Sequence, residues 1–287
     1  LSDPAQYPAF LDELARTNGA VSRATREQLA LAAFARTAAY DATIEVVLRA
    51  KLTTTTETLP ERFALHGQRL GDPLRYGENP HQRAALYRGT RAVGLGALVV
   101  LSEGKELSYN NLLDVDAAMS LAHALPGTGA CVIKHAGPCG AAVHADLAGA
   151  IDAAWEGDPV SAFGSVIGLN RPLDRAGAEA LAKKGFIEVI VAPGFDEAAL
   201  EVLRGRKGWG QTLRIVQASP PAPADDLLEV RSLSGAFLVQ ERDRAAPARW
   251  ELVTKRAPTQ GELAAMVGSR PLSGDDTVTH FFAMIRP

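Results

Sequence analysis

The pattern of hydrophobic and polar positions changes near residue 62 of the chain. Before that point the sequence reads as helical, with a start signal at 2–4, a stop at Asn18-Gly19 and a second start at 25–28. The stretch 51–60, with its run of threonines and its final proline, is interpreted as a strand or connector. We therefore expect a short helical segment at the beginning of the chain.

From residue 62 onward, short apolar runs alternate with helical stretches. The runs predict strands at Ala97–Leu101, Ala130–His135, Ser165–Leu169, Phe186–Ala192 and Leu213–Ala218. The stretches between them predict helices at Asn111–Ala124, Leu147–Trp155, Arg175–Lys184 and Asp196–Arg204. Such alternation is typical of an α/β domain whose sheet is covered by helices. A hairpin is expected around Val230–Gln240, and no period is assigned to Gly268–Pro287.

Composition and charge exclude several classes of protein. The formal net charge is −3, so no basic excess favours nucleic acid. No apolar run approaches the roughly 20 residues that a membrane span needs. The two cysteines are too few for a disulfide framework, and no basic leader precedes an apolar core. We expect a cytoplasmic protein with no membrane partner.

The densest polar cluster, at 131–140, follows a predicted buried strand. Lys134 and His135 end this strand and enter a stretch containing glycine and proline, which places them at the carboxyl edge of the sheet, where open α/β sheets bind ligands. Histidine can act as a base near neutral pH, and lysine supplies a cation for an oxyanion. The alternative is a surface loop with a solvated lysine and a packed histidine.

A zinc site is an alternative interpretation of the same segment. Cys131, His135, Cys139 and His144 are close in sequence, but no C-x-x-C pair and no H-x-E motif occurs. Cys131 also alternates with Ile133 along the strand, which favours the core. We expect no metal.

Four further segments contain candidate residues. Arg75 and Tyr76 precede a turn at 77–82, and could contact a phosphate or simply open a strand. Asn111 could cap a helix or offer its amide to a ligand. Gly164 would let a ligand approach the backbone, and Glu188 is a charge within an apolar strand, which is costly unless it is exposed or paired.

No G-x-x-x-x-G-K-[ST], G-x-G-x-x-G or G-x-S-x-G motif occurs, so ATP-dependent and serine-hydrolase chemistry lack support.

Five segments, taken together and in order, carry a resemblance to one family. They are LRYGENPHQ at 74–82, SYNNLLDVDAA at 108–118, IKHAGPCG at 133–140, DPVSAFG at 158–164 and VIVAPGF at 189–195. The chain resembles the bacterial AICAR transformylase/IMP cyclohydrolase. The resemblance implies a cytidine-deaminase-like mixed sheet with flanking helices and without zinc, preceded by the short helical segment.

The resemblance also implies an activity and a division of roles. The family transfers a formyl group from 10-formyltetrahydrofolate, a cosubstrate, to the amine of AICAR in purine synthesis, and it closes the ring to IMP. It implies that Lys134 and His135 are the catalytic pair. It implies substrate contacts by Arg75, Tyr76, Asn111, Gly164 and Glu188. The small-molecule partners would be AICAR and folate, and the intact family protein would be a homodimer.

The resemblance divides the chain into three regions, according to the family domain that each region resembles. Residues 1–66 resemble the end of the cyclohydrolase domain, 67–263 resemble the first half of the transformylase domain, and 264–287 diverge. Gly137 stands where the bacterial family usually has asparagine. Because much of both family domains has no counterpart here, the alternative is a catalytically incompetent chain that at most binds nucleotide. A zinc nucleoside deaminase is disfavoured by its absent ligands.

Overall fold

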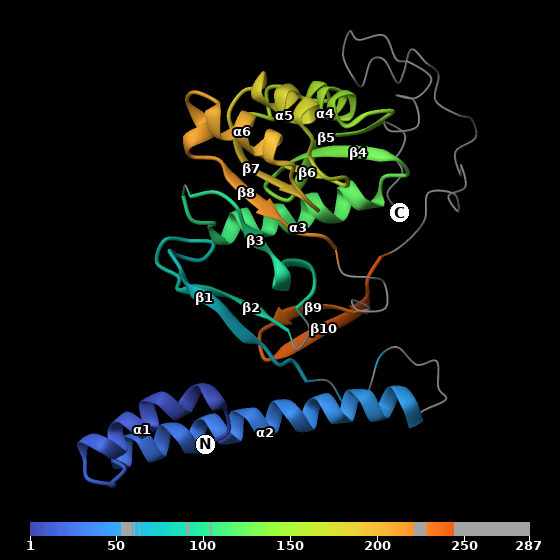
Figure 1. Ribbon diagram of the computed structural model, residues 1–287. Helices are drawn as coiled ribbons and strands as arrows, with labels where there is room; N and C mark the ends of the chain where they lie inside the picture. Colours follow the sequence, from blue (N-terminus) through green and yellow to red (C-terminus); the bar gives the residue numbers. More distant parts are fainter. Residues whose placement is uncertain are drawn as a thin grey trace. The chain divides into compact units, whose positions relative to one another are not determined.

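The structure, a computed structural model, describes residues 1–52, 59, 61–62, 64–89, 92–103, 105–220 and 228–243 (Figure 1). The chain divides into two compact units, Leu1–Gln68 and the part from Arg69 onward. Most of the predicted connector at 51–60 and all of the divergent region 264–287 lie outside the described residues.

The first unit is helical, as predicted. It contains a short 3-10 helix η1 (Pro4–Gln6), α1 (Tyr7–Arg16) and α2 (Arg23–Leu52). Asp3 caps η1, and the predicted stop after α1 is confirmed by Asn18 and Gly19, whose φ angles are 53° and 90°. None of the helices in the described ranges is both long and apolar enough to cross a membrane.

The second unit is built on a six-stranded mixed sheet with the order β3-β8-β7-β6-β4-β5. Its strands are β3 (Val99–Val100), β4 (Thr128–Lys134), β5 (Gly137–His144), β6 (Ser165–Leu169), β7 (Ile187–Ala192) and β8 (Arg214–Gln217). β6, β7 and β8 are parallel to one another, whereas β3, β4 and β5 are each antiparallel to their neighbours. The predicted α/β class is confirmed.

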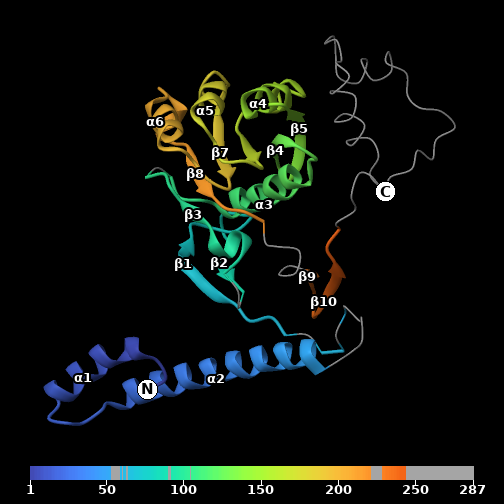
Figure 2. The same cartoon turned by 45° about the vertical axis from the view of Figure 1, so that its right-hand side comes forward.

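Helices cover both faces of this sheet, as the two views show (Figures 1 and 2). α3 (Tyr109–Ala124) packs against β4, β6 and β7, while α4 (Leu147–Glu156), α5 (Arg175–Ala182) and α6 (Glu197–Gly205) cover the other face. Alternate residues of each strand enter the two cores, so that Cys131 and Ile133 face α3 whereas Ala130 and Val132 face the other layer.

The predicted helix starts correspond to side-chain caps. Ser108, Asp146 and Asp174 each accept a backbone N–H from the first turn of α3, α4 and α5. These bonds satisfy backbone N–H donors that a helix cannot pair internally. The observed starts of α3, α4 and α5 lie within two residues of the predicted starts.

Two smaller sheets complete the described strands. β1 (Gln68–Leu74), which was not predicted, pairs with β2 (Ala84–Arg88), which follows the turn at 77–82 that was interpreted as opening a strand. β9 (Leu228–Leu233) and β10 (Ala236–Glu241) form the antiparallel hairpin expected around Val230–Gln240.

Two strand predictions need correction. The strand predicted at Ala97–Leu101 is reduced to β3, because Gly94–Ala97 form a 3-10 turn, η2. β5 was missed entirely, because its sequence GPCGAAVH is rich in glycine, proline and alanine, which have low strand propensity. Pairing with β4 and packing against α4 override that propensity.

The contact between α3 and β6 gives a stability test. A Cβ on Gly168 would lie 2.5 Å from the Ala118 carbonyl oxygen, whereas a Cβ on Gly205, at the end of α6, would meet nothing within 4 Å. We expect Gly168→Ala to lower the free energy of unfolding by about 2 kcal/mol through overpacking, and Gly205→Ala to leave it unchanged or raise it by up to about 1 kcal/mol. Urea denaturation measures both, and equal effects would contradict the close packing.

Candidate functional site

The sheet brings the ends and starts of several strands to one edge. β4 is antiparallel to β6, with Ile133 opposite Val166, so the end of β4 lies beside the start of β6. The starts of β7 and β8 lie at the same edge because β6, β7 and β8 are parallel. The sequence placed Lys134 and His135 at the carboxyl edge of the sheet. That placement is wrong with respect to the parallel strands, since β4 runs in the opposite direction.

At the other edge, beyond the carboxyl ends of β7 and β8, a pocket of about 310 Å³ is lined by residues that include Gly94, Pro193, Gln217 and Ser219. None of its lining side chains is titratable. Acid–base chemistry needs a group that can exchange a proton, so the amino edge of the parallel strands is the better candidate.

His135 and Ala136 form the tight turn between β4 and β5. Because Lys134 pairs with Gly137, only His135 and Ala136 connect the two strands. The φ angles of His135 and Ala136 are 53° and 59°. Positive φ at both central positions is the geometry of a type I′ hairpin turn, which normally uses asparagine and glycine. Other residues adopt it at a cost of roughly 1–2 kcal/mol each. The predicted loop after His135 is therefore a hairpin, and His135 is exposed rather than packed.

The turn is held by α3. The backbone N–H of Ala136 donates to Oδ1 of Asp114 at 2.7 Å, and Asp114 is half-buried on α3. This bond offsets part of the cost of the left-handed backbone.

Lys134 is also held in place. Its side chain is half-buried, and Nζ donates to the Phe163 carbonyl oxygen at 2.9 Å. The alternative of a fully solvated lysine is thus not what the structure shows. The ammonium is fixed next to Gly164, the residue that follows Phe163.

Gly164 begins the segment that enters β6. Its φ of 77° is favourable only for glycine, and its N–H donates to the Phe186 carbonyl oxygen at 2.7 Å. This bond ties the loop before β6 to the start of β7.

Glu188 lies at an irregularity of β7. Ser165 pairs with Ile187 but Val166 pairs with Val189, so the register shifts and Glu188 is the extra residue. A bulge of this kind redirects a side chain, and bulges are frequent beside active sites. Glu188 is half-buried, whereas Ile187 and Val189 on either side are fully buried.

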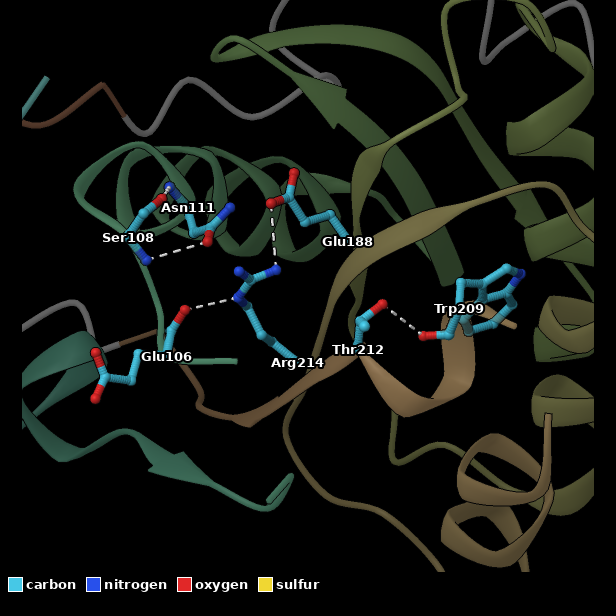
Figure 3. A network of polar contacts seen from close by, with 7 residues as sticks. All are labelled: Glu106, Ser108, Asn111, Glu188, Trp209, Thr212 and Arg214. Atoms are coloured by element: carbon cyan, nitrogen blue, oxygen red, sulfur yellow. Dashed lines mark hydrogen bonds and ion pairs between the residues drawn. The ribbon is translucent and has the colours of Figure 1, made fainter. Parts of the chain in front are cut away.

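The carboxylate of Glu188 is paired with a buried guanidinium (Figure 3). Arg214, only 8% exposed at the start of β8, lies with Nη1 3.2 Å from Glu188 Oε1, and its Nε donates to the Glu106 carbonyl oxygen at 2.8 Å. A buried charge is tolerated when it is paired and hydrogen-bonded. Arg214 therefore links β8 to β7 and to the segment that precedes α3.

Asn111, 4% exposed, lies in the first turn of α3. Its Oδ1 accepts the Ser108 N–H, and its own N–H donates to Ser108 Oγ, both at 3.1 Å (Figure 3). This is a reciprocal capping box, so the capping residue is Ser108 rather than Asn111, and the helix begins at Tyr109.

Arg75 and Tyr76 directly follow β1, a strand of a different sheet from the one that contains Lys134. The Arg75 guanidinium carbon lies 5.5 Å from the centre of the Tyr76 ring, and the Gly77 N–H closes the next turn by donating to the Gln82 carbonyl oxygen at 2.8 Å. The structure thus joins Lys134, His135 and Gly164 through contacts at one edge and places Arg75 and Tyr76 on another element.

The cysteines are arranged as structural residues. Cys131 is fully buried, as its alternation with Ile133 predicted, and burial raises the pKa of its thiol to about 12. Burial and then the Asp158 carboxylate raise the pKa of Cys139, which is half-buried. Within the described ranges, no group of three or more histidine, cysteine, aspartate or glutamate residues is placed to hold a metal ion.

Sequence reasoning missed Arg214 and Asp114. Arg214 is the second residue of the predicted strand Leu213–Ala218 and its only charged residue, and it is opposite in sign to Glu188 in the predicted strand Phe186–Ala192. These two embedded charges could have been paired by that signal. Asp114 gave no comparable signal, because its partner is a backbone N–H 22 residues away.

These features define an α/β protein whose candidate site contains a half-buried lysine and an exposed histidine at a hairpin turn. The family described as the AICARFT/IMPCHase bienzyme matches residues 1–269. The bifunctional purine biosynthesis protein PurH of Chloroflexus aurantiacus is 45% identical over 271 residues, which cover 93% of this chain and 49% of that protein. The PurH of Myxococcus xanthus is 45% identical over 273 residues, covering 92% and 51% respectively.

The chain belongs to the AICARFT/IMPCHase bienzyme family. It spans about half the length of the curated relatives that it matches. The family resemblance inferred from the five sequence segments is confirmed.

A double-mutant cycle tests the Arg214–Glu188 pair. We expect Arg214→Met and Glu188→Gln to be coupled by about 1 kcal/mol in the free energy of unfolding, because the guanidinium is buried. The exposed pair Arg204–Glu197, with its nitrogen and oxygen 3.7 Å apart, should show a coupling below about 0.5 kcal/mol in the same urea titrations. Additive effects at Arg214 and Glu188 would contradict the pairing.

Proposed function

We propose that this chain binds AICAR at the amino edge of β6, β7 and β8 and transfers to it the formyl group of 10-formyltetrahydrofolate. The single observation that supports this most is the placement of Lys134 and His135 at the β4–β5 turn, one fixed by the Phe163 carbonyl and the other exposed. Family membership supplies the substrate class.

The chemistry requires a base near the AICAR amine. The amine nitrogen attacks the formyl carbon, a new N–C bond forms, and the bond from that carbon to N10 of the folate breaks. The attacking nitrogen must lose a proton, and N10 of the folate must gain one as it leaves. An imidazole nitrogen can accept a proton, so the exposed side chain of His135 suits the first proton transfer.

Lys134 has a separate role in this proposal. The formyl oxygen becomes negative as the amine attacks, and an ammonium group held in place stabilises that charge without reorganising during the reaction. An ammonium has three N–H donors, of which the Phe163 carbonyl accepts one. Lys134 would direct another toward the oxyanion or the leaving nitrogen.

The nucleotide contacts extend the same proposal. Gly164 would let the substrate approach the backbone, and Asn111 and Glu188 would supply an amide and a carboxylate near the start of β7. Arg75 and Tyr76 would contact the phosphoribosyl part. A homodimeric intact protein, which rests on the family alone, and a cytoplasmic location, expected from the composition, complete the proposal.

An assay of the purified chain with AICAR and 10-formyltetrahydrofolate tests the function. We expect turnover, with kcat lowered about 100-fold or more by Lys134→Ala and by His135→Ala, because each removes a group that acts in the transition state. The matched controls are Lys183→Ala and His144→Ala, which change an exposed lysine and an exposed histidine away from the turn.

Two outcomes would contradict the proposal in different ways. If the wild-type chain and Lys134→Ala both bind AICAR in calorimetry and neither forms product, the chain binds nucleotide but is not a transferase. A chain that does not bind AICAR has its site elsewhere or lacks one.

A further inference from the structure

The turn that carries His135 has little support from its own hairpin. Between β4 and β5 the register shifts after Val132, because Val132 pairs with Gly140 but Ile133 pairs with Pro138, which leaves Cys139 as an extra residue. Proline has no N–H to donate to the ladder. The last part of the hairpin before the turn therefore has fewer ladder bonds than a regular one.

The backbone of the turn is also unfavourable in itself. His135 and Ala136 both adopt the left-handed region, at φ of 53° and 59°, which β-carbon-bearing residues seldom occupy. A short hairpin end with a weakened ladder and two such residues needs an anchor outside the hairpin if it is to present one conformation.

Asp114 provides an anchor from a different element. Its Oδ1 accepts the Ala136 N–H at 2.7 Å. α3 is itself fixed to the sheet one turn further on, where the Cys131 thiol donates to the Ala118 carbonyl oxygen at 3.2 Å and Gly168 leaves no room for a Cβ beside the same carbonyl. The carboxylate of Asp114 therefore belongs to a helix, α3, that packs closely against β4 and β6.

We propose that Asp114 is a positioning residue for formyl transfer, which fixes the left-handed turn so that His135 faces the AICAR amine. This inference rests on the proposed function. Asp114 acts through the Ala136 N–H and does not contact the substrate. Its hydrogen-bond acceptor, rather than its charge, is what the reaction needs.

Three variants of the full chain separate these possibilities. Asp114→Ala removes the acceptor and should lower kcat about tenfold while KM for AICAR changes less than about twofold, since the base is misplaced but the nucleotide contacts remain. Asp114→Asn keeps a side-chain carbonyl and should stay within about twofold of the wild type in kcat. Asp114→Ala with Ala136→Gly should recover most of the lost kcat, because glycine adopts the left-handed region without strain.

A matched control distinguishes positioning from general stability. Asp174 also accepts a backbone N–H, that of Gly177 at 2.8 Å, but at the N-cap of α5. Asp174→Ala should lower the melting temperature at least as much as Asp114→Ala and leave kcat unchanged. Amide hydrogen exchange gives a readout that does not depend on activity: exchange at Ala136 should accelerate about tenfold in Asp114→Ala and not in Asp174→Ala.

The outcomes are distinct. If Asp114→Asn is as slow as Asp114→Ala, the charge matters and the positioning role is wrong. If both variants raise KM for AICAR, Asp114 contacts the substrate directly. If the Ala136 amide exchanges at the same rate in Asp114→Ala as in the wild type, the anchor does not exist. An inactive wild-type chain overturns the proposed function itself, whereas an active wild type with an equally active Asp114→Ala overturns only the role of Asp114.

Discussion

The antiparallel pairing of β4 with β6 is the constraint on which the candidate site depends. β6, β7 and β8 run in one direction, and if β4 ran with them, Lys134 would lie at the opposite edge from Gly164 and Glu188. Reversal of this one strand places the end of β4 beside the starts of the parallel strands. Everything proposed for the site, including the oxyanion contact and the base, follows from that juxtaposition.

Local irregularities then adapt this edge to chemistry. Register shifts occur in two strands near it, at Cys139 in β5 and at Glu188 in β7, and the β4–β5 turn contains two left-handed residues. Such features cost stability and persist where surrounding contacts hold them, which is common at functional sites. Here the contacts come from Asp114, Arg214 and the Phe163 carbonyl, all outside the distorted segments. The rigid layers of the fold thus support an edge that would be unfavourable alone.

The sequence predicted those parts of the fold that local patterns determine. β6 was predicted at its observed bounds and α4 within one residue, because an apolar run and an aspartate cap define them. β5 could not be predicted, because pairing and packing form it against its own propensity, and strand direction is a property of tertiary contacts. Lys134 and His135 were identifiable by type and position, but the wrong sheet edge was inferred because the rule for parallel strands was applied to an antiparallel one. Asp114 acts through a backbone N–H that is distant in sequence, which no local pattern indicates, whereas Arg214 and Glu188 could have been paired from their opposite charges on two largely apolar strands.

The central claim is that the substrate binds at the edge formed by the β4–β5 turn. Titration of unlabelled AICAR into the ¹⁵N-labelled chain, followed by two-dimensional NMR, tests it directly. The account predicts shifts of the amide signals of His135, Ala136 and Gly164, with those of Gly94 and Ser219 in the pocket at the other edge unchanged. Shifts confined to Gly94 and Ser219 would contradict it.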